Sequence, residues 1–262
     1  MFIEERHQEI LKIIQEYGRI SIGEIQEKFE VSVDSARRDL RILEEKELLK
    51  RTHGGAIPIQ KVGYSLPRHR DFKNMENMEL YEHYAAIAKK ATTFIKENDI
   101  AYLTNYPVGF AMLKYLPKDI RYTLVVNSAS LADELKYWDN IMVYVTGGAM
   151  RLHSAASFVD SFATNFVKNM HFDLCLMAGS GYDTTFGFSS ATNETAIFQR
   201  TVIENSRKKI LLASHQHVGI KAFIKVCEAD QFDIFITDWD TVADELTKIE
   251  EVGIEVIVAN KE

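Results

Sequence analysis

The stretch SIGEIQEKFEVSVDSARRDLRILEEKELLKRTHGGA, residues 21–56, decides the fold of the N-terminal part of this 262-residue chain. Ser21 followed three positions later by Glu24 is a capping box, which predicts the start of a helix. Ser32 predicts a second helix start, and the helical period then runs from Val33 to Glu45. Leu48 to Ala56 predict two short strands around a glycine turn. An apolar helical repeat precedes this stretch, so the pattern as a whole predicts a winged helix-turn-helix.

The predicted third helix and hairpin carry the residues that would contact DNA. Between Arg37 and Lys61 there are seven basic and four acidic residues, although the whole chain has a net charge of -7. A winged helix-turn-helix inserts its third helix into the major groove and sets its caps and wing on phosphates. The contacts expected on this basis are Ser21, Ser32, Ser35, Arg37, Arg38, Arg41, Arg51, Thr52, His53, Gly54 and Gly55. A small helical module for protein interaction is the alternative.

Composition restricts the class of protein. With 46% hydrophobic and 26% charged residues, the chain is expected to fold rather than to stay disordered. Cys175 and Cys227 are too few and too far apart for a disulfide framework or a thiolate zinc site. The sequence has no signal-peptide core and no apolar run near the roughly 18 residues that span a bilayer. We therefore expect a cytoplasmic protein with no membrane partner.

The composition changes once along the chain, near residues 55–75, which predicts an interdomain linker there. Residues 1–56 form the predicted winged helix-turn-helix domain, residues 57–77 the linker and residues 78–262 a larger domain. In the larger domain, buried-type apolar runs alternate with helical patterns, which predicts a mostly parallel α/β sheet covered on both faces. The runs are Ile100–Leu103, Thr123–Val126, Ile141–Val145, Leu174–Ala178, Ile210–Ala213, Ile234–Thr237 and Ile254–Ala259.

Candidate effector ligands follow these runs, because ligands of open α/β sheets bind beyond the carboxyl ends of the strands. Small polar residues, glycine pairs and one arginine in such loops suit a phosphate or sugar hydroxyls. The residues expected to form the site are Thr104, Asn105, Tyr106, Asn127, Ser128, Gly147, Gly148, Arg151, Ser154, Gly179, Gly181, Glu194 and His217. For any single loop, a plain glycine turn is the alternative.

The N-terminal domain closely resembles that of the DeoR family of bacterial transcription regulators. The resemblance rests on Arg37-Arg38-Asp39-Leu40 and on Arg51-Thr52-His53-Gly54-Gly55-Ala56, and it continues through the larger domain. It implies a sequence-specific regulator, expected to repress a carbohydrate-utilisation operon, with a sensor domain that resembles sugar-phosphate isomerases. The implied partners are double-stranded operator DNA and a sugar or sugar phosphate. One recognition helix covers only a few base pairs, so a homodimer or homotetramer is also expected.

Departures from the family pattern fall in the ligand-facing loops. Relatives commonly have Asp-x-Gly-Thr-Thr after the first sensor strand, whereas this chain has Thr104-Asn105-Tyr106-Pro107-Val108. Pro107 removes a backbone donor and Tyr106 brings a bulky ring, so a backbone phosphate cradle is not expected. Ser214-His215-Gln216-His217 replaces Asp-Ser-Ser-Lys, and Asp160 and Gln199 replace a glycine and a lysine. We expect the usual phosphosugar site to be degenerate.

Three alternatives remain for the larger domain. A sugar-phosphate isomerase would need a carboxylate base such as Glu194, Asp183 or Asp160. His215 and His217 alternate as metal ligands would, but no further ligand has a matching spacing. A regulator without any small-molecule effector is the third. The prediction is a protein that is not an enzyme, with no catalytic residues, no metal and no cofactor.

Overall fold

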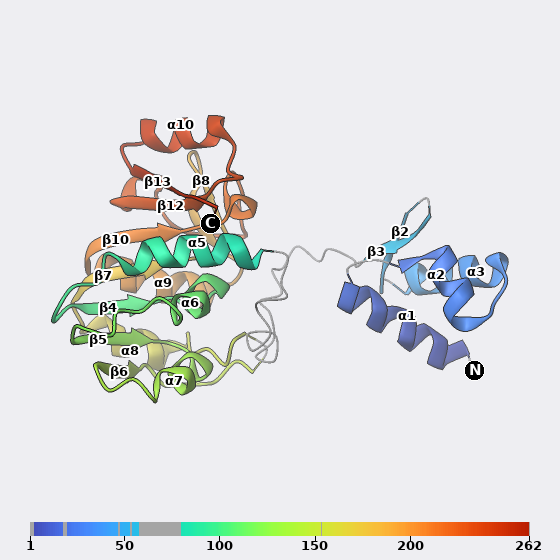
Figure 1. Cartoon of the computed structure of the whole chain (residues 1–262), viewed down its shortest axis with the longest axis horizontal. Coiled ribbons are helices and arrows are strands. Elements are labelled where there is room, and N and C mark those ends of the chain that lie inside the picture. The colour runs from blue at the N-terminus through green and yellow to red at the C-terminus, as the bar shows by residue number, and fades with distance from the viewer. Residues whose placement is uncertain are drawn as a thin grey trace. The chain divides into compact units, whose positions relative to one another are not determined.

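The computed structural model describes residues 3–17, 20–46, 48–52, 54–57, 80–152 and 154–261 (Figure 1). These residues form two compact units, one up to residue 57 and one from residue 80. The proposed linker over residues 57–77 lies, apart from its first residue, outside the described residues, and so does His53. Each unit is therefore described by itself.

The N-terminal unit contains three helices and a small antiparallel sheet of order β1-β3-β2. Its elements are α1 (Ile3–Tyr17), β1 (Ile20–Ser21), α2 (Ile22–Phe29), α3 (Val33–Glu45), β2 (Lys50–Thr52) and β3 (Gly55–Ile57). The predicted winged helix-turn-helix is confirmed, with the third helix at its predicted bounds. The two-residue strand β1 is additional, because it exists only through its pairing with β3 later in the chain.

A single apolar core holds this unit together. One apolar stripe from each helix meets the hairpin there, as the helical spacing predicts. Its most buried members are Ile10, Ile14, Ile20, Ile25, Ala36, Leu40, Leu43, Leu49 and Ala56.

The larger unit is built on a seven-stranded sheet of order β13-β12-β10-β7-β4-β5-β6. All its neighbouring strands pair in parallel. The strands are β4 (Ile100–Leu103), β5 (Tyr122–Val126), β6 (Ile141–Val145), β7 (Phe172–Met177), β10 (Ser206–Leu212), β12 (Ile234–Asp238) and β13 (Glu255–Ala259). The predicted mostly parallel α/β fold is confirmed, and each predicted run is a strand.

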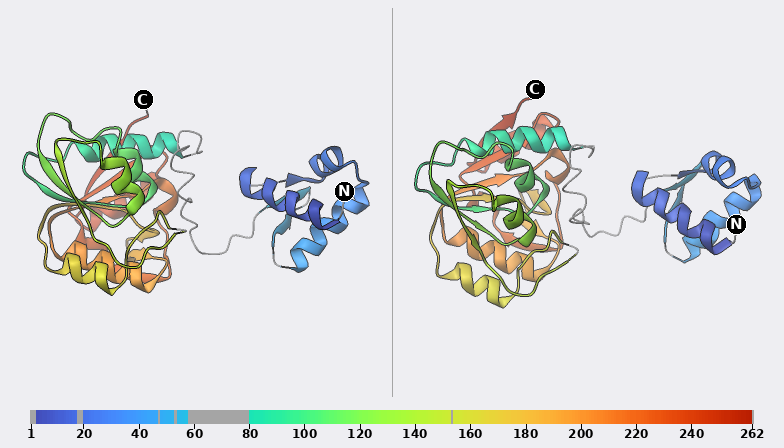
Figure 2. Two further views of the ribbon diagram at one scale, coloured as in Figure 1. Left: turned by 90° about the horizontal axis from the view of Figure 1, so that it is seen from below. Right: turned by 60° about the horizontal axis from the view of Figure 1, so that its bottom comes forward.

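Helices cover both faces of this sheet (Figure 2). They are α5 (Tyr81–Thr92), α6 (Pro107–Met112), α7 (Ala129–Leu135), α8 (Ser161–Lys168), α9 (Asn193–Glu204) and α10 (Ala243–Glu251). On β7, Leu174 and Leu176 belong to the core shared with α5, α6 and α7, whereas Cys175 and Met177 belong to the core shared with α8, α9 and α10. This two-sided burial explains why the strands are continuous apolar runs.

A second, antiparallel sheet of order β11-β9-β8 was not predicted from the sequence. It consists of β8 (Gly181–Asp183), β9 (Gly187–Ser190) and β11 (Ile224–Cys227), with the short 3-10 turns η2 (His215–His217) and η3 (Ala229–Gln231) nearby in the chain. These strands have only three or four residues, β8 and β9 contain glycine, and β11 pairs with β9 across more than thirty positions. None of these features gives a local signal.

The strand order reverses between β4 and β7. From β4 the chain adds β5 and β6 on one side, then returns to add β7, β10, β12 and β13 on the other. The loops after β4 and β7 therefore leave the same edge in opposite directions, which opens a crevice typical of ligand sites in α/β sheets. No helix among the described residues is long and apolar enough to cross a membrane.

Candidate functional site

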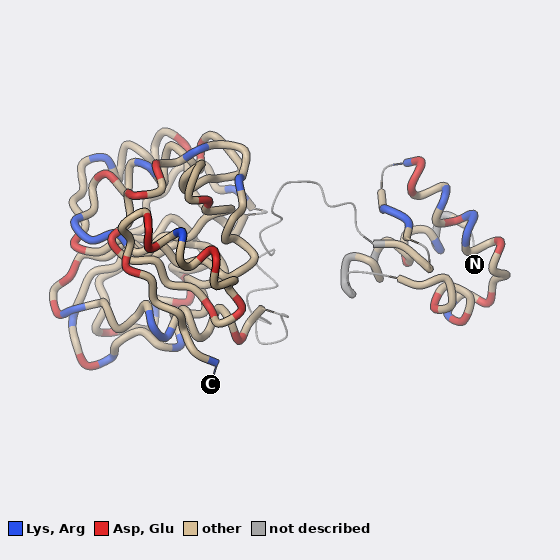
Figure 3. The backbone as a smooth tube through the Cα atoms, turned by 90° about the horizontal axis from the view of Figure 1, so that it is seen from above, with Lys and Arg blue, Asp and Glu red and all other residues tan. Residues whose placement is uncertain are grey.

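Helix α3 presents three arginines on the side opposite its buried stripe. Ser32 caps the helix, and its hydroxyl accepts a hydrogen bond from the Ser35 amide at 3.2 Å. Arg37, Arg38 and Arg41 are exposed. Spacings of three and four residues bring Arg41 onto the same helix surface as the other two. The three arginines thus form a compact cationic surface on α3. The rest of the N-terminal unit is not basic, because acidic and basic residues are mixed along it (Figure 3).

Asp39 fixes the orientation of this helix. It is 1% exposed, and its carboxylate accepts hydrogen bonds from Arg6 Nε at 2.7 Å and Arg6 Nη2 at 3.2 Å. His7 Nε2 lies 3.0 Å from the same carboxylate. The bond to Asp39 raises the pKa of Arg6. The acidic residue of the Arg-Arg-Asp-Leu motif thus joins α3 to α1, while the two arginines before it face outward.

The second helix and the wing share a base. Ser21 and Glu24 form the predicted capping box, with the Ser21 amide 2.6 Å from the Glu24 carboxylate. The Ile22 amide donates to the Gly54 carbonyl at 2.9 Å. A Cβ on Gly55 would lie 2.0 Å from the Ile20 carbonyl oxygen, so only glycine fits where β3 crosses β1. Gly55 is therefore required where the strands cross, whereas Gly54 supports the hairpin through its carbonyl oxygen.

Strand β2 supplies the exposed part of the wing. Lys50, Arg51 and Thr52 are all exposed. The Arg51 amide donates to Glu44 Oε1 at 2.9 Å, and its guanidinium lies 3.7 Å from Glu44 Oε2. Glu44 thereby ties the wing to the last turn of α3.

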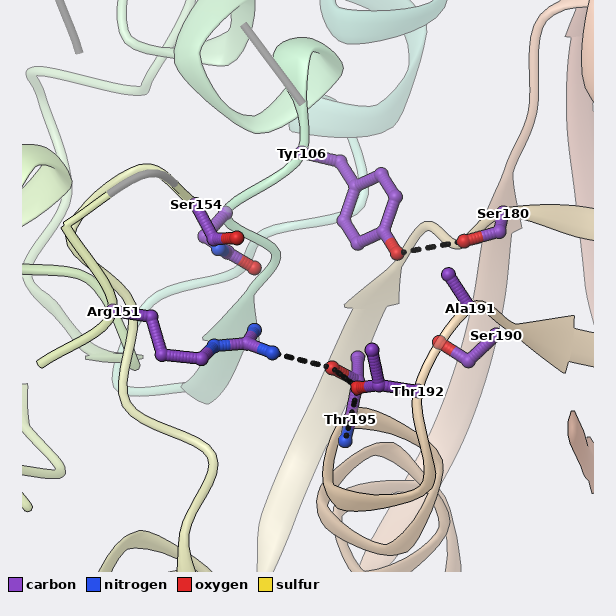
Figure 4. A pocket seen from close by; sticks show the side chains of 9 residues that line it. Tyr106, Arg151, Ser154, Ser180, Ser190, Ala191, Thr192 and Thr195 are labelled. Carbon is purple, nitrogen blue, oxygen red and sulfur yellow. Dashed lines mark hydrogen bonds between the residues drawn. The ribbon is translucent and has the colours of Figure 1, made fainter. Parts of the chain in front are cut away.

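A polar pocket occupies the crevice where the strand order of the large sheet reverses (Figure 4). Its lining comes from the loop after β4, the loop after β6, the loop after β7 and the start of α9. The lining residues are Asn105, Tyr106, Arg151, Ser154, Ser180, Ser190, Ala191, Thr192 and Thr195. Four of them, Asn105, Tyr106, Arg151 and Ser154, were predicted from the sequence. The others lie after β7, at the end of β9 and at the start of α9, and none of them was predicted.

Arg151 is the cation of this pocket. It points across the pocket to Thr195, with Nη1 3.1 Å from the hydroxyl, and its Nη2 donates to Ser157 Oγ at 3.0 Å (Figure 4). Burial lowers the pKa of Arg151, while Tyr106 and Glu194 act in the opposite direction. An arginine keeps its charge under such a shift. The pocket therefore presents a fixed guanidinium to a ligand.

Tyr106 closes the opposite side. Its ring is buried, and its hydroxyl lies 3.3 Å from Ser180 Oγ (Figure 4). Tyr106 is the N-cap of α6 and Pro107 is the first helical residue, where a missing amide costs no helical hydrogen bond. The loop after β4 thus presents a tyrosine ring to the pocket and continues into a proline.

Two predicted residues lie behind the pocket and position Arg151. Asn127 accepts from the Tyr102 hydroxyl at 3.1 Å and donates to the Phe158 carbonyl at 3.1 Å. Ser128 caps α7 and donates to the Ala155 carbonyl at 2.5 Å. Both contacts hold the turn whose Ser157 carbonyl accepts the Arg151 amide.

The remaining predicted effector residues lie outside the pocket lining. Thr104 is buried, with its amide bonded to the Leu176 carbonyl, and Gly147 and Gly148 have positive φ in the turn after β6. Gly179 and Gly181 permit close packing, since an added Cβ would meet the Phe188 ring or the Ile220 carbonyl. Glu194 is exposed in the first turn of α9. His217 follows β10, and burial lowers its pKa.

The two other departures from the family pattern are structural. Asp160 caps α8 through the Ala163 amide and also accepts the Ala149 amide at 2.8 Å, and these bonds lower its pKa. Gln199 is buried, accepts from Ser190 Oγ at 2.9 Å and donates to the Ala178 carbonyl at 3.0 Å. Gln199 therefore joins two loops of the pocket wall, a role that the sequence did not indicate.

Comparison with known proteins agrees with both units. Residues 79–239 match the DeoR C terminal sensor domain, and residues 6–62 match the DeoR-like helix-turn-helix domain. The chain belongs to the DeoR family. This DeoR-family chain is thus a transcriptional regulator with a DNA-binding helix-turn-helix domain and a sensor domain.

Relatives match over nearly their whole length. The DeoR-family chain is 29% identical over 253 residues to the HTH-type transcriptional regulator GlpR of Haloferax volcanii, covering 97% of this chain and 96% of that protein. It is 31% identical over 238 residues to the uncharacterized HTH-type transcriptional regulator YulB of Bacillus subtilis, covering 91% and 90%. It is 27% identical over 241 residues to the lactose phosphotransferase system repressor of Staphylococcus aureus, covering 90% and 92%. Among solved structures, a D-ribose-5-phosphate isomerase in complex with phospho-erythronic acid is 13% identical, with a TM-score of 0.40 over 53% of this chain and 55% of that chain.

The Asp39 anchor predicts a stability effect confined to the N-terminal unit. Asp39→Ala leaves the nearly buried Arg6 charge without its partner, and breaking such a pair costs about 3–5 kcal/mol. We expect amides in α1 and α3 of the full chain to lose hydrogen-exchange protection by a corresponding amount. Asp34→Ala, at an exposed position of the same helix, is the control and should cost less than about 1 kcal/mol. Equal losses for the two variants would contradict the anchor.

Proposed function

We propose that this regulator represses a carbohydrate-utilisation operon by binding double-stranded operator DNA through α3 and the wing. The observation that carries the proposal is the anchored helix, on which Asp39 is buried and Arg37, Arg38 and Arg41 are exposed. A helix held in one orientation presents guanidinium groups to base edges without a large ordering cost. Ser21, Ser32, Ser35, Arg51, Thr52, His53, Gly54 and Gly55 are the proposed supporting contacts. Operator DNA lies in the cytoplasm, and we infer that the protein acts there.

The charge balance of the N-terminal unit supports selective binding. Residues 1–60 contain ten Lys or Arg and twelve Asp or Glu, so the unit has little general attraction for DNA. Sequence-independent affinity comes from neutralised phosphates and is correspondingly small here. Most of the operator affinity is therefore expected from base contacts by the α3 arginines, with Arg51 and Thr52 in the wing contacting phosphate.

We further propose that the pocket lined by Arg151 and Tyr106 binds a small carbohydrate that carries no phosphate. It is called the switch-point pocket below, because the strand order of the large sheet reverses there. Its lining offers the hydroxyls of Ser154, Ser180, Ser190, Thr192 and Thr195 for sugar hydroxyls. Arg151 is the one cationic side chain in the described lining, which suits a neutral sugar or a singly charged sugar acid. Tyr106 and Pro107 stand where close backbone donors to a phosphate would be needed. The relatives' names, such as the lactose phosphotransferase system repressor, support a carbohydrate as the class.

We infer that the pocket does not catalyse isomerisation. A sugar isomerase needs a carboxylate base beside the substrate carbon, and the described lining contains none. The three carboxylates that the sequence offers as a candidate base lie outside the lining, and two of them have structural roles. Asp183 accepts bonds from Thr185 and the Phe186 amide, Asp160 caps α8, and Glu194 is exposed beside the pocket.

Self-association is part of the proposal, because one winged helix covers too few base pairs for tight binding alone. The edge strand β6 exposes Met142 and Tyr144, and the following turn exposes Met150 and Leu152. An edge strand with exposed apolar side chains invites a partner. We propose that a second copy of this chain covers it, in a homodimer or in a homotetramer built from such dimers.

Arg38→Ala should weaken specific operator binding by about 1–3 kcal/mol, roughly 5- to 150-fold, because a contact to a base edge is lost. Gel shifts against DNA from the gene's own upstream region would measure it. Arg207→Ala, an exposed arginine of the sensor unit, is the matched control and should bind normally. Native affinity in the Arg38 variant would remove α3 from the proposed interface.

Titration calorimetry with sugars, sugar acids and sugar phosphates should give saturable binding for a sugar or sugar acid and none for the phosphates. Arg151→Ala should lower the affinity for a sugar acid at least tenfold, because the pocket loses its cation. Arg207→Ala should leave that affinity unchanged. Micromolar binding of a common sugar phosphate that depends on Arg151 would contradict the proposed ligand class.

Analytical ultracentrifugation should show the native chain as an oligomer. The double variant Met142→Lys and Tyr144→Lys should reduce the mass, since each charge would be buried in the contact between copies. Phe223→Ser, which removes a side chain that is 82% exposed on a different element, should leave the mass unchanged. An unchanged oligomer in the double variant would place the contact elsewhere.

A further inference from the structure

A second polar cluster lies at the carboxyl end of the sheet, and none of its members lines the switch-point pocket. His83 comes from α5, His215 from η2 after β10, and Asp238 and Asp240 from the end of β12 and the turn that follows it. One potential ligand atom from each residue lies within 4.8 Å of all the others. Residues distant in the sequence meet here because β10 and β12 are parallel neighbours.

The spacing of the cluster suits a metal ion. His83 Nε2 lies 2.7 Å from Asp240 Oδ2, and His215 Nδ1 lies 2.9 Å from Asp238 Oδ1. In a tetrahedral site with bonds of about 2.0–2.1 Å to nitrogen and oxygen, neighbouring ligand atoms are roughly 3.3 Å apart. The two bonded pairs are closer than that, and all four ligand atoms lie within 4.8 Å of one another. Side-chain movements of up to about 1.5 Å would bring the four donors around one ion.

The surrounding contacts hold the ligands in place. The fully buried Asp238 also accepts the amides of His215 at 2.9 Å and of Asp240 at 3.0 Å. The His83 ring stacks on Trp239 at 4.4 Å and meets the His215 ring edge-on at 5.0 Å. His83 Nδ1 is buried and has no hydrogen-bond partner among the described residues. Backbone amides thus hold Asp238, and ring packing holds the His83 imidazole.

The charge of the cluster also favours a cation. Two carboxylates face two imidazoles, so with neutral rings the group carries two negative charges. A divalent ion placed among the four side chains would neutralise these two charges.

We propose that His83, His215, Asp238 and Asp240 bind a divalent transition-metal ion, with Zn²⁺ as the reference case. Two imidazoles and two carboxylates suit zinc, nickel or cobalt, whereas magnesium and calcium prefer oxygen ligands throughout. The ion would join α5, the first helix of the sensor unit among the described residues, to the ends of β10 and β12. This site is independent of the carbohydrate pocket and does not rest on the proposed effector.

From the sequence, the candidate metal ligands were a different pair of histidines. His215 and His217 alternate, which suggested a shared direction, but His217 is not a member of the cluster. His215 instead turns to Asp238 and His83. Since His215 stands in the loop where DeoR relatives have Asp-Ser-Ser-Lys, this departure from the pattern supplies a ligand.

The test uses the full chain without an affinity tag. Titration calorimetry with ZnCl₂ should give one saturable site per chain that excess Mg²⁺ does not compete away. Ni²⁺ or Co²⁺ should quench tryptophan fluorescence, because Trp239 stacks on a ligand ring, and Trp239→Phe should remove that quenching while leaving Zn²⁺ binding. Zinc should also raise the unfolding temperature in a concentration-dependent way.

Two variants address the ligands separately. His83→Gln and Asp240→Asn should each lower the zinc affinity at least tenfold, the loss typical of removing even an outer partner of a metal site. His171→Gln, an exposed histidine outside the cluster, is the matched control. Asp240 is half-exposed, so its variant is expected to fold, and metal-free unfolding curves verify this. Absence of saturable binding of Zn²⁺, Ni²⁺ and Co²⁺ up to about 1 mM, or equal affinity in native protein and both variants, would overturn the proposal.

Discussion

All seven strands of the large sheet run in one direction, and the sites of the sensor unit depend on that constraint. Parallel strands deliver every following loop to the same edge. Where the strand order reverses between β4 and β7, the loops diverge, and the switch-point pocket lies between them. Where the order continues from β10 to β12, the loops stay together and bring His215 against Asp238. One topology therefore produces an open crevice at one place and a closed cluster of side chains at another.

In the N-terminal unit, the orientation of α3 depends on a buried carboxylate. Asp39 lies between arginines that must face outward, and its contacts with Arg6 and His7 fix the rotation of α3 against α1. An apolar residue there would bury well but would not specify that rotation. The ion pair thus contributes orientation as well as stability, which a helix that must match DNA requires.

Local signals in the sequence were sufficient for most of the fold. The capping residues Ser21 and Ser32 gave the helix starts, and the seven apolar runs gave the strands because burial on both faces removes any polar alternation. The sheet of β8, β9 and β11 could not be predicted, because its strands are too short to show a pattern. In the pocket, Arg151 and Tyr106 could be predicted because they stand in loops directly after predicted strands. The positions of the remaining polar residues could not be predicted, because they are set by the sheet of β8, β9 and β11 and by the start of α9; these residues are Ser180, Ser190, Thr192 and Thr195. The partnership of His83 with His215 required tertiary structure, since no local spacing connects them.

Gln199 makes the wall of the pocket depend on one buried amide. Its oxygen accepts from Ser190 Oγ and its amide nitrogen donates to the Ala178 carbonyl, so one side chain joins the loop after β7 to the end of β9. A carboxylate in its place would face the Ala178 carbonyl without a proton to donate. The position of Ser190, and with it one hydroxyl of the pocket, therefore depends on a residue that does not itself line the pocket.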